Sequence, residues 1–128
     1  MSTVTLTADS FQDTVTDNDI VMVDFWAEWC GPCKSFAPVY EATSDSNPDI
    51  VFGKVDTEAE QALAGAAGIQ SIPTLMVFRE GVMVFRQSGA LPQQAMDQLI
   101  SQVRELDMED VHRQVAEAAA ESATQASQ

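Results

Sequence analysis

The chain has 128 residues, of which 45 % are hydrophobic, and its 20 acidic and 6 basic residues give a net charge of −14. This length suits one domain with a single core. The acidic balance disfavours nucleic acid and anionic membranes as partners, because phosphate binding depends on clustered lysine and arginine. No stretch approaches the ~20 apolar residues of a membrane span, and the N-terminus lacks the basic and apolar regions of a secretory signal. We therefore expect a monomeric cytoplasmic protein.

The apolar pattern predicts the order β-α-β-α-β-α-β-β-α. Alternating strands and helices indicate parallel pairing in the first part, and the tight turn Glu80-Gly81 indicates an antiparallel hairpin. We therefore predict an α/β fold in which a mixed central sheet of about five strands is flanked by about four helices. The expected strands are 4–6, 20–26, 50–56, 74–78 and 82–86, and the expected helices are 11–15, the cysteine pair to 43 with a kink at Pro38, 58–67, and 92–106.

Both cysteines of the chain lie in the pentapeptide Trp29-Cys30-Gly31-Pro32-Cys33, directly after an apolar strand. A C-x-x-C pair that opens a helix is typical of a redox dithiol, because the helix N-terminus favours the nucleophilic thiolate. A disulfide in so short a loop removes little chain entropy. We therefore interpret it as a bond made and broken in function, with Cys30 as the exposed nucleophile and Cys33 as the resolving thiol.

Two other interpretations of the cysteine pair stay open at this point. The pair could be inert and buried, or it could supply half of a metal site. A zinc site needs two more ligands, but the chain has no third cysteine, and its one histidine, His112, lies near the C-terminus. We therefore expect no metal.

Asp24 interrupts the apolar run 20–26. Buried carboxylates are rare unless they are paired or take part in chemistry. Desolvation should raise the pKa of this carboxyl, so Asp24 stands out as either one member of a buried ion pair or a group that takes part in the chemistry.

The segment from Val23 to Lys34 resembles the active-site segment of bacterial thioredoxins. Further matches follow in the family's order, at Ala37-Pro38, Lys54-Val55-Asp56, Ser71-Ile72-Pro73-Thr74, Gly81 and Ser88-Gly89-Ala90. The resemblance covers residues 2–106 and implies the thioredoxin fold and a general protein disulfide reductase. It also implies that no cofactor is bound, and that electrons come from NADPH through a flavoprotein thioredoxin reductase. The implied partners are that reductase and disulfide-containing client proteins.

The resemblance assigns roles to individual residues. Cys30 would attack a client disulfide, Cys33 would resolve the mixed disulfide, and Asp24 would accept the proton of Cys33. Lys54 would be the charge partner of Asp24, and a purely structural ion pair between the two stays the alternative.

The resemblance also implies a client-binding surface. Pro73 would be a cis proline that faces the cysteines and turns the backbone of Ile72 toward an extended client peptide. Trp26 would pack beneath the site, and Trp29 would be exposed beside Cys30. The whole surface would comprise Trp29, Gly31, Pro32, Ile72, Pro73, Gly89 and Ala90.

Residues 107–128 form an acidic segment beyond the expected thioredoxin domain, 1–106. Val111, Val115 and Ala118 indicate a weak amphipathic helix, and the composition after Ser122 predicts disorder. The segment could be a solubility tail, a partner-docking helix or a cap over the site.

Two other functions stay open for a chain of this kind. One is a dithiol oxidase or isomerase, which Gly31-Pro32 between the cysteines disfavours. The other is a non-enzymatic chaperone or assembly subunit with the same fold.

Overall fold

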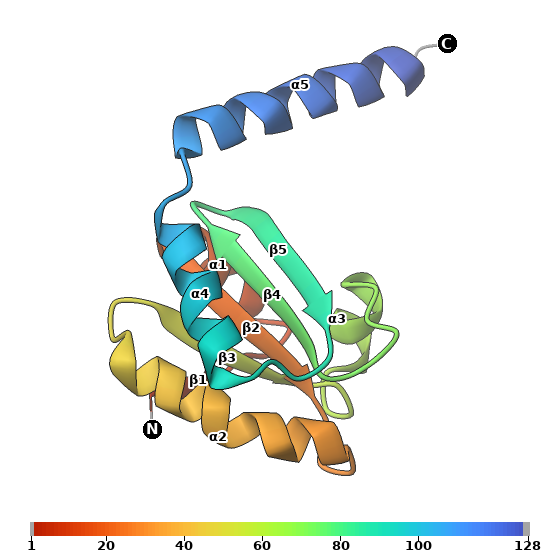
Figure 1. Ribbon diagram of the computed structural model, residues 1–128. Coiled ribbons are helices and arrows are strands. Elements are labelled where there is room, and N and C mark those ends of the chain that lie inside the picture. Colours follow the sequence, from red (N-terminus) through yellow and green to blue (C-terminus); the bar gives the residue numbers. More distant parts are fainter. Residues whose placement is uncertain (1, 127–128) are drawn as a thin grey trace.

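The structure, a computed structural model, describes residues 2–126. Its core is one five-stranded sheet with the strand order β1-β3-β2-β4-β5 (Figure 1). The elements in chain order are β1 (Thr3–Thr5), α1 (Phe11–Asp17), β2 (Ile20–Trp26), α2 (Gly31–Ser46), β3 (Val51–Asp56), α3 (Gln61–Ala66), β4 (Thr74–Arg79), β5 (Val82–Ser88), α4 (Gln93–Arg104) and α5 (Met108–Ala126).

The sheet is mixed, as the sequence predicts. β1 and β2 both run parallel to β3, whereas β4 runs antiparallel to β2 and to β5. Glu80 and Gly81 connect the hairpin and both have positive φ, 51° and 81°. Because β2 lies in the middle of the sheet, its carboxyl end meets the carboxyl end of β3 and the start of β4.

Helices cover both faces of the sheet, and each face has its own apolar core. On one face, side chains of α2 and α4 such as Phe36, Tyr40 and Met96 pack against Met22 and Phe52. On the other face, the core combines strand residues with Val15 of α1 and with Leu63 of α3. This two-sided burial explains why β2 is apolar along nearly its whole length.

Two arginines of the sheet form hydrogen bonds with the C-terminal ends of helices. Arg79 at the end of β4 donates through Nη1 to the carbonyl oxygens of Val103, Arg104 and Leu106, at 2.8, 3.2 and 3.1 Å. Arg86 of β5 donates to the carbonyl oxygens of Ala67 and Gly68 just after α3. These bonds satisfy carbonyl groups that a helix end leaves without partners.

The structure has five helices in the described residues, whereas the predicted fold has about four, and the additional helix is α5. It continues through Ala126, where the sequence predicts disorder from Ser122, because its alanine-rich composition favours helix despite the lack of apolar bulk. Ser127 and Gln128 lie outside the described residues. The division of the chain at residue 106 stays a prediction.

α5 begins beside the β4–β5 turn and projects from the domain (Figure 1). Met108 at its start is buried, and His112 Nε2 lies 2.9 Å from Glu80 Oε1. The turn is at the end of the sheet opposite the cysteines, because β4 runs antiparallel to β2. In this arrangement α5 is therefore not a cap over the cysteine pair. Across residues 2–126, no helix combines the length and apolarity needed to cross a bilayer.

Candidate active site

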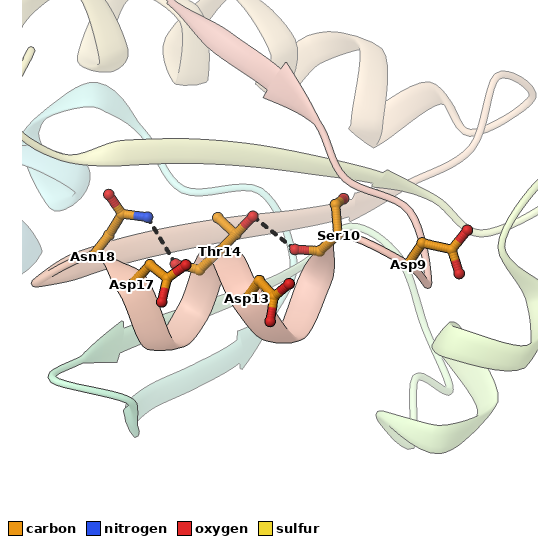
Figure 2. A pocket seen from close by; sticks show the side chains of 6 residues that line it. All are labelled: Asp9, Ser10, Asp13, Thr14, Asp17 and Asn18. Atoms are coloured by element: carbon orange, nitrogen blue, oxygen red, sulfur yellow. Dashed lines mark hydrogen bonds between the residues drawn. The ribbon is translucent and has the colours of Figure 1, made fainter.

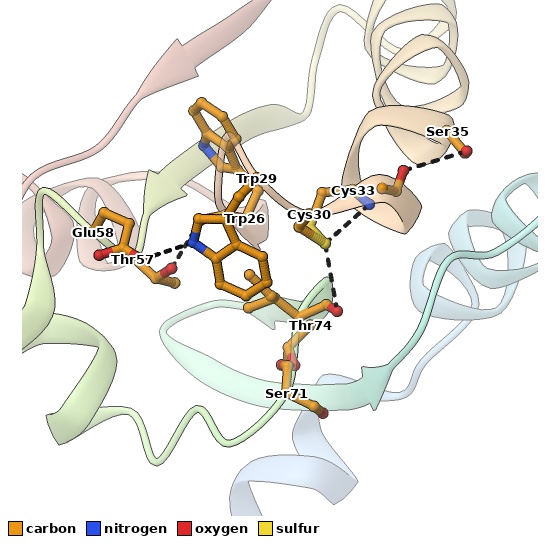
Figure 3. The surroundings of a disulfide bond; sticks show 11 residues. Trp26, Trp29, Cys30, Cys33, Ser35, Thr57, Glu58, Ser71 and Thr74 are labelled. Carbon is orange, nitrogen blue, oxygen red and sulfur yellow. Dashed lines mark hydrogen bonds between the residues drawn. A yellow bond between two sulfur atoms is a disulfide. The ribbon is translucent and has the colours of Figure 1, made fainter.

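The two cysteines open α2 and are joined by a disulfide (Figure 3). Cys30 is the N-cap residue of the helix, with φ −87° and ψ 110°, and its Sγ accepts a hydrogen bond from the backbone N–H of Cys33 at 3.2 Å. The two Cα atoms are 5.2 Å apart. The structure thus confirms the pairing and the helix N-terminal position that the sequence predicts.

The expectation that Cys30 is the exposed cysteine is wrong for this oxidised form. Cys30 is 4 % exposed and Cys33 is 3 % exposed, so burial does not distinguish them. Trp26 and Ile72 pack against the cysteines and cover them. The two cysteines differ in position, because Cys30 is the N-cap residue and its sulfur accepts a hydrogen bond from the backbone N–H of Cys33.

A loop from the other side of the sheet faces the cysteines. The Ile72–Pro73 peptide bond is cis, as the resemblance implies. The carbonyl oxygen of Ile72 lies 3.7 Å from Cys30 Sγ, and the N–H of Gly89 donates to the carbonyl oxygen of Pro73 at 2.7 Å. The antiparallel pairing of β2 with β4 brings these segments together.

Trp29 stands exposed at the edge of the site, as expected, with 69 % of its surface accessible. Its Nε1–H donates to Glu58 Oε1 at 2.7 Å. Glu58 follows β3, and the Asp56 carboxylate holds its backbone by accepting the N–H of Glu58 at 2.9 Å. The active-site motif does not indicate Glu58, although an acidic residue just past the end of a strand parallel to β2 is a usable signal for it.

The expected client-binding residues are brought to one region, with one correction. Five of these residues are exposed, namely Trp29, Gly31, Pro32, Gly89 and Ala90, and Ile72 is half-buried. Pro73 is buried and contributes through its backbone. Beside the disulfide lies a hollow of about 280 Å³, lined by Trp29, Thr57, Ala64, Ile69, Gln70, Ser71 and Ile72. The hollow is open enough to receive a side chain of another protein.

Asp24 is buried in β2, with 1 % of its surface exposed. Burial raises the pKa of its carboxyl to about 7, and the positive charge of Lys54 opposes that rise. Within residues 2–126, neither carboxylate oxygen receives a hydrogen bond. The carboxyl can therefore gain or lose a proton near neutral pH.

Lys54, the charge partner that the resemblance implies for Asp24, lies directly across from it in the sheet, and its positive charge opposes the rise of the Asp24 pKa. The two residues are register partners on β2 and β3. The described residues show no ion pair between them within 4 Å, and Lys54 Nζ instead lies 5.0 Å from the centre of the Trp26 ring. Lys54 acts on Asp24 through its charge at longer range, and a cation–π contact holds its ammonium group.

Another hollow, of about 400 Å³, lies along α1 (Figure 2). The carboxylates of Asp9, Asp13 and Asp17 line it, together with Thr14 and Asn18, whose side chains bond to backbone carbonyls of the same segment. In the part of the chain that the structure describes, no group of three or more His, Cys, Asp or Glu residues is arranged to hold a metal ion.

Comparison with known proteins agrees with this geometry. The Thioredoxin family model matches residues 2–102. Putative thioredoxin 2 of Streptomyces coelicolor is 60 % identical over 121 residues, which cover 94 % of this chain and 90 % of that relative. The thioredoxin of Bacillus subtilis is 39 % identical over 102 residues, or 79 % of this chain and 97 % of the relative.

Solved structures share the fold. A thioredoxin of Plasmodium falciparum superposes with a TM-score of 0.72 at 37 % identity, covering 78 % of this chain and 97 % of that one. Identity at this level, the matching family model and the disulfide at the start of α2 lead to one conclusion. The chain belongs to the thioredoxin family of thiol–disulfide oxidoreductases.

Proposed function

We propose that the protein is a general reductase of protein disulfides and that Cys30 makes the first attack on the client. The observation that carries this proposal is the pairing of Cys30 with Cys33 at the N-terminus of α2, where the N–H of Cys33 donates to the sulfur of Cys30. That hydrogen bond and the helix dipole both stabilise negative charge on this sulfur.

The exchange transfers two electrons from the cysteine pair to the client. The reduced Cys30 thiolate attacks one sulfur of the client disulfide, a Cys30–client bond forms, and the other client sulfur leaves as a thiolate. Cys33 then loses its proton and attacks the Cys30 sulfur. The Cys30–Cys33 disulfide of this structure forms, and the client leaves as a dithiol.

We propose that Asp24 accepts the proton that Cys33 loses. Its carboxyl is buried in the strand that leads to the cysteines, and burial raises its pKa to about 7. A base whose pKa lies near the working pH is best suited to take up and release a proton. Lys54 tunes this group by its charge and is a positioning residue.

The backbone of Ile72 is the docking point that we assign to the client. Ile72 forms no backbone–backbone hydrogen bond with the other described residues. Its C=O faces Cys30 Sγ at 3.7 Å, and its N–H can pair with an extended peptide. The exposed contact residues around Ile72 are Trp29, Gly31, Pro32, Gly89 and Ala90. The buried Pro73 orients the backbone of Ile72.

The remaining parts of the proposal concern the cell. A flavoprotein thioredoxin reductase would restore the dithiol with electrons from NADPH, and the protein would work as a cytoplasmic monomer. Because the redox chemistry resides in the cysteine pair, we propose that no bound cofactor takes part.

Two measurements test the function together. We expect the protein to reduce insulin when NADPH and a thioredoxin reductase are supplied, and Cys33→Ser to accumulate a mixed disulfide with the client through Cys30. The matched variant Cys30→Ser should trap no client. A Cys30–Cys33 couple that is much more oxidising than the glutathione pool would indicate an oxidase or isomerase instead. Failure with every thioredoxin reductase would indicate a chaperone or assembly subunit.

A further inference from the structure

A cleft between β5 and α5 lies at the end of the sheet opposite the disulfide. It has a volume of about 330 Å³. Its walls are Val82, Met83 and Val84 of β5 and Val111, Val115 and Ala118 of α5, and Gln114 is the polar residue of the lining. This volume is at the lower end of the range for binding pockets and accommodates a few side chains.

Exposed apolar side chains gather at this cleft. In the described residues, four large hydrophobic side chains are strongly exposed, namely Val4, Trp29, Met83 and Val115. Trp29 belongs to the redox site, whereas Met83 and Val115, at 48 % and 46 % exposed, stand on the two walls of the cleft. Exposed apolar side chains gathered on one surface mark an interaction site.

The α5 wall has the spacing of a helix-binding face. Val111, Val115 and Ala118 follow the i, i+4, i+7 pattern, which places them on one side of the helix. The side chains from His112 to Ala123 are all exposed, so this part of α5 packs little of its surface against the domain. Most of the stability of a helix in a protein comes from packing of its apolar face, so a partner laid along the apolar side of α5 would stabilise it.

The charge around the cleft indicates which charge a partner would carry. The basic groups of α5 are engaged within the protein, His112 with Glu80 and Arg113 with Asp110 and Glu117. α5 carries four acidic residues against one arginine, and Glu121, three residues after Ala118 on the same side of the helix, has no ion pair among the described residues. The rim on the α5 side therefore carries net negative charge. A second copy would bring two such rims together, which like-charge repulsion opposes.

We propose that this cleft binds an amphipathic helix of a partner protein, with apolar anchors between β5 and α5 and lysine or arginine residues facing the acidic rim. The site is separate from the redox site. It also lies partly outside the shared domain, because the family model ends at residue 102. The match to the Streptomyces relative spans 121 residues, more than the 106 that precede this segment, so that relative shares part of it.

The probe for the test is a fluorescently labelled synthetic peptide of about 15 residues with leucine on one helical face and lysine on the other. A leucine–glutamate peptide of the same length is its control. Titration of the oxidised full-length protein should show saturable binding of the lysine peptide that weakens with salt, and no binding of the glutamate peptide.

Single substitutions locate the binding. Met83→Ser and Val115→Ser should each weaken binding about threefold to tenfold. Val4→Ser is the matched control because Val4 is 45 % exposed on β1, at the far edge of the sheet, and it should change binding less than about twofold. Equal weakening by all three would overturn the proposal in favour of unspecific attraction to an acidic protein, and so would the absence of saturable binding.

Charge variants and the oligomeric state complete the test. Glu121→Gln should weaken binding and reduce its salt dependence, whereas Asp13→Asn, the same charge change on α1, should not. A dimer that Val115→Ser dissociates would show that a second copy occupies the cleft and would overturn the proposal. Insulin reduction should be unaffected by Met83→Ser and Val115→Ser, so failure of this proposal and failure of the reductase function are separate results.

Discussion

The indole nitrogen of Trp29 donates a hydrogen bond to the carboxylate of Glu58, and this bond connects the loop after β2 to the loop after β3. Because Trp29 is 69 % exposed, packing contributes little to the position of its ring. The position of the ring beside the disulfide therefore depends strongly on one exposed acceptor. A tryptophan held in this way reports on changes at the neighbouring cysteines.

The first prediction concerns this bond. Reduction with dithiothreitol should change the fluorescence of the protein, because Trp29 lies next to Cys30. Glu58→Ala should shrink that change, since the freed ring samples more orientations, and should lower the rate of insulin reduction by less than about threefold. Glu28→Ala, which removes an exposed acid beside Trp29, should leave both unchanged. Emission that is insensitive to dithiothreitol in the parent protein would count against this arrangement.

The second prediction concerns the pH dependence of stability. Burial raises the pKa of Asp24 from 3.8 to about 7. Below pH 4 the carboxyl is neutral in both the folded and the unfolded state. Between pH 4 and pH 7 the unfolded chain releases the proton and the folded chain keeps it, so the folded state loses stability as the pH rises. The full cost, roughly 4 kcal/mol, is present above pH 7.

Asp24→Asn should therefore stabilise the protein by about 2–4 kcal/mol at pH 8, and the gain should fall toward zero near pH 4. Urea unfolding across this range measures the difference. Asp13→Asn is the control, since Asp13 is exposed on α1 and should show no such trend. A stability gain for Asp24→Asn that does not vary with pH would refute the assigned cause.

The third prediction separates the stability of Asp24 from its role in the exchange. In rapid mixing, Asp24→Asn should leave the attack of Cys30 nearly unchanged and slow the resolution of the mixed disulfide by about a hundredfold or more, since general acid–base catalysis contributes about 10²–10⁴-fold. In the parent, the resolution rate should rise as the pH passes through about 7. An unchanged turnover of Asp24→Asn from about pH 6 to 9 would remove the proton-acceptor role.

The fourth prediction concerns the tie between β4 and the end of α4. Arg79→Met should lower the free energy of unfolding by about 2–3 kcal/mol, because three carbonyl groups lose a charged donor. Arg113→Met, on the exposed face of α5, should cost less than about 0.5 kcal/mol. Equal effects of the two substitutions in urea unfolding would show that the Arg79 bonds contribute no more than a surface ion pair.

The fifth prediction compares two glycines. A Cβ at Gly53 in β3 would collide with the Leu6 side chain, whereas a Cβ at Gly65 in α3 meets no neighbour within 4 Å. Gly53→Ala should therefore destabilise the protein by about 1–3 kcal/mol. Gly65→Ala should stabilise it by about 0.5–1 kcal/mol, as expected for a helix interior. Thermal unfolding of the two variants should give melting temperatures that move in opposite directions.

Much of the fold follows from local patterns in the sequence. Strand 20–26 and the Glu80-Gly81 hairpin are correct because an apolar run and a turn dipeptide are local signals. Helix 58–67 is shorter in the structure, Gln61–Ala66, because Asp56 and Thr57 shape the loop that precedes it. The end of α5 is helical and not disordered, because the helix propensity of its alanines outweighs its low content of bulky apolar residues.

The site is predictable where a motif specifies it and not where side chains from different segments meet. The cysteine pair and the cis peptide at Pro73 follow from the family resemblance. The bond between Trp29 and Glu58 depends on the parallel arrangement of β2 and β3, and no local pattern encodes it. Lys54 has two possible partners nearby, the ring of Trp26 and the carboxylate of Asp24. The sequence alone does not show that its ammonium group lies over the ring.

The contact between Cys30 and Ile72 spans 42 residues of sequence and depends on the pairing of β2 with β4. A chain that has emerged from the ribosome only as far as α3 holds both cysteines but lacks the strand that faces them. That chain also lacks the backbone of Ile72, which we propose as the docking point for clients. Client selection therefore begins only after a long-range contact has closed, which is a slow event in folding.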